Sequence, residues 1–361
     1  MRIAFATDGF FPHTIGGMQR HTTLLANALV DLGFDVDVYA PDGHEQGDQR
    51  FRVITLPWPD DHVYPVTLHR WARRLAPAVG AGGYDAVYAQ GLTLGGRVPA
   101  SVAPTIYNPH GLEMFMPASP VDTAKSWPLR VAARREAKVA SRVISLGGKL
   151  TEIAVRGFGI PPERVAVVPN GVDTNDFRPG DTAREPGLLL FVGRFFRNKG
   201  VDLLLEAFAS VEVPDARLLL VGSGPLRGQL ESRSHDGRVT FLGAVTEDEL
   251  ADLYGRAACV VVPSRSDGMP TVILEAFACG TPAIASDVGA VAEMVDDETG
   301  ILLTPEDVPA LTAALQTMVN RPVAELDALG AAARAKAEAL FSWPSVAART
   351  AEVFEQVVRE R

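Results

Sequence analysis

Residues 188–200 read Leu-Leu-Leu-Phe-Val-Gly-Arg-Phe-Phe-Arg-Asn-Lys-Gly, and a helical pattern follows directly over residues 201–211. The apolar run at the start of this stretch is typical of a strand that is buried on both faces. A strand joined to a helix by a short loop is the unit from which parallel sheets are built. The stretch therefore predicts an α/β fold, with Gly193 ending a strand and Gly200 near the start of a helix.

The same alternation of short apolar strands and amphipathic helices runs through both halves of the chain. Before the quoted stretch we expect a helix over residues 17–32 and strands over residues 2–7, 35–40, 84–89, 104–107, 142–146 and 164–168. After it we expect helices over residues 247–257 and 272–279, and strands over residues 216–221, 239–242, 259–262, 282–285 and 300–303. Strands separated by helices imply right-handed crossovers and parallel pairing.

The chain divides into two such α/β units. Residues 176–187 contain two prolines and few apolar side chains, which predicts a linker. A length of 361 residues also exceeds what a single core usually serves. We therefore expect two Rossmann-like parallel-sheet domains, residues 1–180 and 181–341, facing a central cleft at the carboxyl ends of their strands. Residues 342–361 read as a terminal helix.

Composition and charge exclude several classes of protein. Apolar residues make up 47% of the chain, and no apolar run reaches the roughly 18 residues of a membrane span. A net charge of −10 argues against a nucleic-acid partner, which needs a basic surface. Cys259 and Cys279 lie in apolar stretches, so we expect both thiols to be buried and reduced in a cytoplasmic protein.

Arg194 and Lys199 lie in the loop between the quoted strand and its helix. A helix N-terminus beside the carboxyl end of a strand favours anions through its free N–H groups and its dipole. Two cations at such a place suit a diphosphate group. The alternative is a pair of solvated cations on an ordinary loop.

Asp267 and Glu275 form an acidic pair, eight residues apart. Asp267 ends the loop after a predicted strand, and Glu275 lies inside an otherwise apolar helix. A carboxylate there is costly unless it is paired or binds hydroxyl groups, such as the vicinal diol of a sugar. The alternative is a structural salt bridge. Gly268 would permit a close approach of the backbone at the start of the helix.

Three further motifs give weaker indications. Gly16 and Gly17 would let the backbone approach a ligand at a helix start, or they form a simple turn. His110 follows a predicted strand and would face the cleft, unless it is an ordinary loop histidine. The glycines of residues 222–228 have the spacing Gly-x-Gly-x-x-x-Gly, and Pro225 removes an N–H donor. That spacing excludes the dinucleotide fingerprint, and with it a nicotinamide dehydrogenase.

The order of these motifs resembles that of retaining glycosyltransferase family 4, whose fold is called GT-B. The likeness covers most of the chain and includes Val-Pro-Asn-Gly-Val-Asp at residues 168–173. It implies an enzyme that moves a hexosyl group from a UDP- or GDP-linked sugar to a hydroxyl acceptor, with retention of configuration. The nucleotide sugar would be a co-substrate, and neither a cofactor nor a metal would be required.

The resemblance also implies a role for each residue of the site. Arg194 and Lys199 would bind the donor diphosphate, and Glu275 would hold the ribose hydroxyls. The base would lie near Val245. Contacts with the donor sugar would come from Asp267, Gly268, Met269, Pro270 and Thr271.

The N-terminal domain would contribute the remaining groups. Gly17, next to Gly16, would approach the phosphate, and His110 would lie beside the transferred sugar. The terminal helix of residues 342–361 would pack back onto this domain. The resemblance thus gives four catalytic residues: His110, Asp267, Arg194 and Lys199.

The chain departs from the family pattern in the acidic motif. The family usually has glutamate where Asp267 stands, and the aspartate side chain, one methylene shorter, would reach less far toward the sugar. Gly-Phe-Gly-Leu often follows that acid, whereas residues 268–271 read Gly-Met-Pro-Thr. Pro270 has no N–H to donate, which would narrow the choice of donor.

Two basic stretches of the N-terminal half, residues 69–74 and 125–142, suit an anionic acceptor or membrane. On one helix, Arg130, Arg134, Lys138 and Arg142 would share a face. This predicts peripheral contact with the inner face of the membrane. The alternative is a solvated helix face.

Two rival functions stay open at this point. A nucleotide-sugar epimerase or hydrolase with the same fold would consume the donor without an acceptor. A non-catalytic subunit would tolerate the loss of Lys199 and Glu275, and both residues are present.

Overall fold

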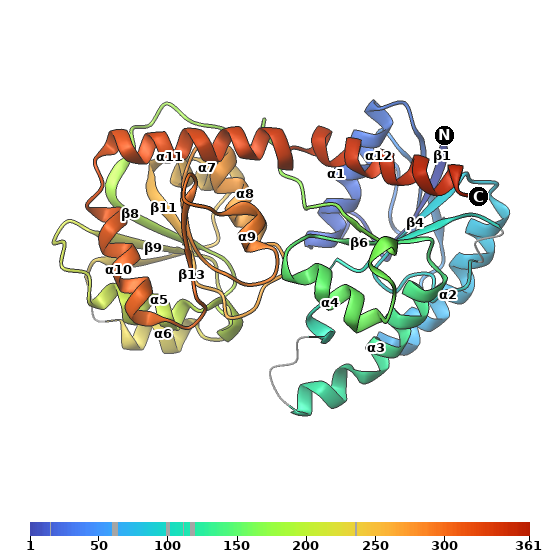
Figure 1. Ribbon diagram of the computed structural model, residues 1–361, viewed down its shortest axis with the longest axis horizontal. Coiled ribbons are helices and arrows are strands. Elements are labelled where there is room, and N and C mark those ends of the chain that lie inside the picture. Colours follow the sequence, from blue (N-terminus) through green and yellow to red (C-terminus); the bar gives the residue numbers. More distant parts are fainter. Residues whose placement is uncertain (15, 60–63, 99–101, 111, 116–119, 235–236) are drawn as a thin grey trace. The chain divides into compact units, whose positions relative to one another are not determined.

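The computed structural model describes residues 1–14, 16–59, 64–98, 102–110, 112–115, 120–234 and 237–361. They form two compact units, Met1–Asn170 with Trp343–Arg361, and Gly171–Ser342 (Figure 1). The sequence placed the boundary after residue 180. The second unit begins earlier because the guanidinium of Arg334 donates to the carbonyl groups of Thr174 and Phe177, at 3.1 and 2.9 Å.

The first unit is built on a seven-stranded sheet in the order β3-β2-β1-β4-β5-β6-β7, and every neighbouring pair is parallel. Its strands are β1 (Arg2–Ala6), β2 (Asp35–Pro41), β3 (Arg52–Leu56), β4 (Ala86–Gln90), β5 (Thr105–Asn108), β6 (Arg142–Ser145) and β7 (Val165–Val167). The sequence did not predict β3. It is an edge strand with no fully buried residue, so its apolar pattern is weak.

Helices α1 and α12 pack together in the first unit (Figure 1). They share an apolar core with the strands, in which Leu25 and Phe354 meet Phe5, Tyr88 and Ile106. The helices of this unit are α1 (Gly17–Asp31), α2 (Tyr64–Ala81), η1 (Glu113–Phe115), α3 (Pro120–Val139), α4 (Lys149–Phe158), η2 (Pro162–Arg164) and α12 (Trp343–Arg359). The last segment of the chain therefore completes the core of the first unit.

The second unit has a parallel six-stranded sheet in the order β10-β9-β8-β11-β12-β13. Its strands are β8 (Glu185–Val192), β9 (Arg217–Val221), β10 (Val239–Gly243), β11 (Ala257–Val262), β12 (Ala283–Ser286) and β13 (Gly300–Leu303). Its helices are η3 (Arg197–Lys199), α5 (Val201–Ala209), α6 (Arg227–Arg233), α7 (Glu247–Arg256), α8 (Thr271–Ala278), α9 (Val291–Met294), α10 (Val308–Val319), α11 (Val323–Lys336) and η4 (Ala337–Phe341).

Strand β8 begins within the stretch that the sequence assigned to a linker. Glu185 pairs with Ala257 of β11, and its carboxylate forms ion pairs with Arg217 and Arg256. Residues 185–187 therefore belong to the strand, because the backbone pairing and the ion pairs of Glu185 outweigh the weak strand propensity of a Glu-Pro-Gly sequence.

The interior confirms the expectation for the cysteines. Cys259 and Cys279 are both buried and free. Burial, followed by the nearby Glu275, raises the pKa of the Cys279 thiol to about 12, so the thiol is protonated at neutral pH. Within the described ranges, no helix combines the length and the apolar character that a membrane crossing requires.

Each sheet has one point at which the strand order reverses. The reversal lies between β1 and β4 in the first unit and between β8 and β11 in the second. Open parallel sheets bind ligands at such points, outside the carboxyl ends of the strands. In the second unit the two loops concerned are residues 193–200 and 263–270.

These two loops of the second unit are tied to each other. The Arg265 N–H donates to the carbonyl of Asn198 at 2.8 Å, and its guanidinium donates to the carbonyl of Arg197 at 2.7 Å. Gly200 has a φ of 69°, and an added Cβ would lie 2.0 Å from the carbonyl oxygen of Pro263. A side chain at position 200 would therefore push the loops apart.

Gly200→Ala is expected to destabilise the protein by about 2–3 kcal/mol, because it adds both backbone strain and a steric clash. Chemical unfolding, followed by circular dichroism, measures the change. Gly228→Ala is the matched control, since Gly228 lies in α6 and an added Cβ there meets nothing within 4 Å. Equal unfolding curves for the two variants would contradict the tight contact between the loops.

Candidate active site

Arg194 and Lys199 lie in the loop after β8. Arg194 is exposed, and its Cζ lies 5.0 Å from the ring centroid of Phe196. The side chain of Lys199 is 24% exposed, and its Nζ lies 2.6 Å from Oδ2 of Asp267. Among the described residues Arg194 has no carboxylate partner, so its guanidinium is available to an anion.

Asp267, in the loop after β11, is more deeply engaged than the sequence suggested. Its carboxylate accepts hydrogen bonds from Lys199, from the Ser264 hydroxyl at 3.2 Å and from the Gly268 N–H at 3.1 Å. Its side chain is only 14% exposed. The structure thus joins Lys199 and Asp267 into one ion pair at the strand reversal, whereas the sequence treated them as separate groups.

Glu275 lies in α8, where it is the partly exposed member of an otherwise buried run, residues 273–278. The hydroxyl of Tyr254, in α7, donates to Oε2 of Glu275 at 2.9 Å. Burial, and then the charge of Glu275, raises the pKa of Tyr254 well above its ordinary value, so this donor is protonated. Tyr254 therefore orients Glu275. Sequence reasoning missed it, because a tyrosine in an amphipathic helix gives no signal of its own.

The segment between Asp267 and α8 is packed against the loop after β12. The Ala290 N–H donates to the Gly268 carbonyl at 2.8 Å, and an added Cβ at Gly289 would lie 2.1 Å from the same oxygen. Met269 and Pro270 are buried, whereas Thr271 is exposed at the start of the helix. This segment can therefore offer a ligand its backbone and Thr271, but not the side chains of Met269 and Pro270.

The glycines after β9 have a structural role. An added Cβ would lie 2.0 Å from the Gly193 carbonyl oxygen if placed at Gly222, and 2.6 Å from that of Phe195 if placed at Gly224. The loop after β9 therefore packs directly against residues 193–200. This contact accounts for Gly222 and Gly224, the first two glycines of the motif at residues 222–228.

Val245 lies after β10, half-buried, next to Thr246, the N-cap of α7. Strand β9 separates β10 from β8 in the sheet, so Val245 lies two strands away from the loop that carries Lys199. All the predicted residues of the second unit thus follow strand ends or lie on α8.

Gly16, Gly17 and His110 belong to the first unit. Gly17 is the first residue of α1, and an added Cβ there would meet no described atom within 4 Å. His110 follows β5 with a φ of 55°. Burial, and then the nearby His21, lowers the pKa of His110 well below its ordinary value, so the ring is neutral at pH 7. These residues also lie at the carboxyl edge of their sheet.

The four basic residues that were predicted to share one helix face do not form such a face. Helix α3 ends at Val139, and Arg142 begins β6 instead, where it binds Glu360 at 2.6 Å. Arg130 donates to the carbonyl of Met114 at 2.5 Å. The predicted four-residue face is therefore wrong, because the buried residues after Arg142 draw it into the sheet. The side chain of Lys125 lies outside the described residues.

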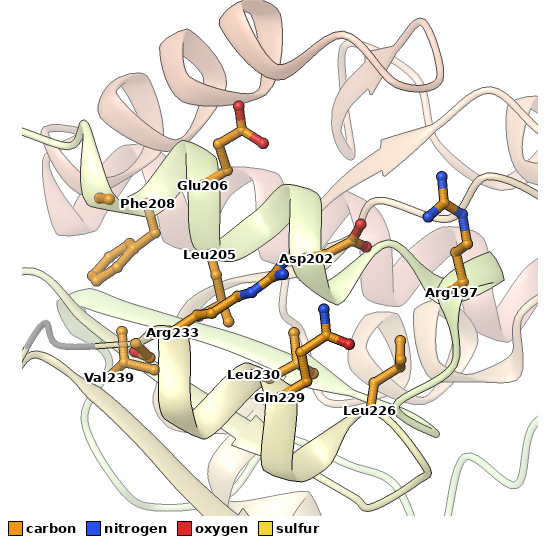
Figure 2. A pocket seen from close by; sticks show the side chains of 12 residues that line it. Arg197, Asp202, Leu205, Glu206, Phe208, Leu226, Gln229, Leu230, Arg233 and Val239 are labelled. Carbon is orange, nitrogen blue, oxygen red and sulfur yellow. The ribbon is translucent and has the colours of Figure 1, made fainter.

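A groove of about 540 Å³ lies between α5 and α6, and its lining reaches Arg197, in the loop that carries Arg194 and Lys199 (Figure 2). Its lining includes Leu205, Phe208, Leu230 and Arg233, and it contains none of the predicted site residues. Across the described ranges, no group of three or more His, Cys, Asp or Glu side chains is arranged to hold a metal ion.

Comparison with known proteins matches both units. Residues 15–176 match the model of the family described as Glycosyltransferase Family 4, and residues 186–321 match that described as Glycosyl transferases group 1. The MMP α-(1→4)-mannosyltransferase of Mycolicibacterium hassiacum is 28% identical, over 99% of this chain and 98% of that protein.

Solved structures share the whole architecture. Sucrose-phosphate synthase from Thermosynechococcus elongatus superposes with a TM-score of 0.81 at 24% identity, over 100% of both chains. Anabaena HepE in complex with UDP-glucose superposes with a TM-score of 0.74 at 20% identity, over 99% of this chain and 100% of that one. The two family matches together span both sheets, and the chain therefore belongs to glycosyltransferase family 4, with the GT-B fold.

Proposed function

We propose that the enzyme moves a hexosyl group from a UDP- or GDP-linked sugar to a hydroxyl acceptor, with retention of configuration. The observation that carries this proposal is the pair of cations at the strand reversal of the second sheet. Arg194 has no carboxylate partner among the described residues. Lys199 lies in the same loop as Arg194 and is held by an ion pair with Asp267. The HepE structure with UDP-glucose supports a nucleotide sugar as the donor.

In this mechanism, the bond between the anomeric carbon and the leaving phosphate oxygen breaks as negative charge builds on the diphosphate. Arg194 and Lys199 stabilise that charge. The acceptor oxygen forms the new bond to the anomeric carbon on the same face, and its proton passes to the leaving phosphate. No protein nucleophile takes part. We expect no metal ion to be required, because the two cations neutralise the diphosphate.

The acidic residues have different tasks in this proposal. Glu275, oriented by Tyr254, accepts hydrogen bonds from the ribose hydroxyls. Asp267 is occupied by Lys199, Ser264 and Gly268, so we assign it the task of positioning Lys199. The sugar contact then falls to the backbone of residues 268–271. The base lies near Val245, Gly16 and Gly17 approach the phosphate, and His110 lies beside the sugar.

The expected partner is thus a nucleotide sugar, and an epimerase or hydrolase is the rival function. Donor consumption in the absence of any acceptor would favour that rival.

The buried free thiols of Cys259 and Cys279 support a reducing compartment, so we propose that the enzyme works in the cytoplasm.

Thermal shift with UDP, GDP, ADP and their sugars tests the donor site. At least one should stabilise the protein, by about 2.7 kcal/mol at 100 times its Kd. Glu275→Gln should weaken that binding about tenfold or more, since a charged acceptor of the ribose hydroxyls is lost. Glu298→Gln, an exposed change elsewhere in the second unit, is the control. Stabilisation by none of these compounds would refute the proposal.

Lys199→Ala should lower kcat on the order of 10²-fold or more, because it removes charge stabilisation from the leaving group. Nucleotide release in the presence of candidate acceptors measures this. Lys336→Ala is the matched control, since Nζ of Lys336 also lies 2.6 Å from a carboxylate, that of Asp296. Near-normal turnover of Lys199→Ala would remove Lys199 from the mechanism.

We also propose that α3 contacts anionic membranes. Trp127 is 64% exposed, and Arg134 and Lys138 are exposed too. Positions seven and eleven residues apart share one face of an α-helix. An exposed aromatic ring on the same helix face as two exposed cations suits the interface of an anionic bilayer. This smaller face replaces the four-residue row expected from the sequence.

Vesicles of phosphatidylcholine with phosphatidylserine should co-sediment the protein at low salt and release it at high salt, because screening weakens the attraction. The double variant Trp127→Ser/Lys138→Ser should bind several-fold less. Arg359→Ser, which removes a cation that is 70% exposed on α12, should bind as before. Equal binding to pure phosphatidylcholine, or none at low salt, would contradict the membrane contact.

A further inference from the structure

A buried pair of amide side chains lies beside His110 in the first unit. Gln90 and Asn108 end the neighbouring strands β4 and β5, where they are register partners. They are 0% and 1% exposed. Strand β4 also borders the strand reversal of this sheet, where a ligand is expected. Buried amides at the end of an otherwise apolar sheet need hydrogen-bond partners, and His110 is one of them.

His110 is held at three points. Its N–H donates to Oδ1 of Asn108 at 2.9 Å, and its ring Nε2 lies 2.8 Å from Oε1 of Gln90. Its ring also meets the ring of His21 edge-on, at a centroid distance of 4.7 Å. Because φ of His110 is 55°, these contacts hold a backbone conformation that non-glycine residues rarely adopt. The position of the ring is thus set by the protein.

Gln90 is in turn held by α1. The buried Thr22 hydroxyl lies 2.9 Å from Oε1 of Gln90 and 2.9 Å from the carbonyl of Met18. A hydroxyl has one proton, which serves either Oε1 of Gln90 or the Met18 carbonyl at any moment. Oε1 of Gln90 thus faces both the Thr22 hydroxyl and Nε2 of His110.

A neutral imidazole carries its proton on only one nitrogen, and the partner of each nitrogen decides which. We infer that Gln90 is a positioning residue, which accepts a hydrogen bond from Nε2–H of His110 and so fixes Nδ1 as an acceptor for a hydroxyl of the transferred sugar. This inference rests on the proposed function, in which His110 lies beside that sugar. The lowered pKa of His110, caused first by burial, supports a neutral ring.

The tautomer can be tested without any turnover. Long-range ¹⁵N–¹H spectra of the full chain, with His110 assigned from the His110→Gln variant, should show the proton on Nε2. Gln90→Leu removes the acceptor and should shift the population toward Nδ1–H. A proton on Nδ1 in the unmodified protein, or an unchanged tautomer in a folded Gln90→Leu variant, would overturn the inference.

Kinetics test the consequence of this contact. Gln90→Leu should lower kcat about 10- to 100-fold, with the donor KM changed less than about threefold, as when the outer partner of a functional histidine is removed. Gln90→Glu keeps the acceptor and should recover most of the lost kcat. Thr105→Val removes a buried hydroxyl at the opposite end of β5, and should alter neither tautomer nor kcat.

The two readouts separate this inference from the proposed function. A shifted tautomer with an unchanged kcat would overturn the positioning role of Gln90. Absence of donor turnover in the unmodified protein would overturn the proposed function instead, and the spectra would still decide the tautomer. If Gln90→Leu does not fold, Gln90→Met keeps the length of the side chain and tests the same contact.

Discussion

The ion pair between Lys199 and Asp267 is the contact on which the candidate site of the second unit depends. Each partner lies on a different loop of the strand reversal, and both are largely shielded from solvent. Attraction between shielded charges is stronger than between exposed ones. Gly200 and Arg265 hold the two loops at the separation that the pair needs. An anion that binds Lys199 shares its ammonium with Asp267, so binding depends on both loops at once.

The first unit positions its own groups without an ion pair. His110 is neutral and is held by two buried amides, and burial lowers the pKa of the adjacent His21 to about 4. Neutral groups give directional hydrogen bonds without the cost of burying a charge. Such groups suit the hydroxyls of a sugar, as the cations of the second unit suit a diphosphate.

Local pattern predicted the fold better than it predicted the pairings within the site. Strand β13 spans the four residues that its apolar run predicted. The edge strand β3 and the start of β8 depend on pairing, which local composition does not reveal. Lys199 and Asp267 are 68 residues apart, so only the sheet order brings them together. Gln90 could have been singled out from the sequence. It is a polar residue at the end of a strand, two positions after Tyr88, and therefore on the same buried face.

The choice of aspartate at position 267 has a consequence for sugar recognition in the proposed reaction. A glutamate, usual in the family, would reach one methylene further into the site. The oxygens of Asp267 instead accept hydrogen bonds from Lys199, Ser264 and the Gly268 N–H, which all belong to the two loops of the strand reversal. Pro270 contributes no N–H, so the segment offers fewer donors than its length suggests. In the proposed reaction, the sugar would therefore meet the backbone of this segment, which packs against Gly289, rather than the Asp267 carboxylate.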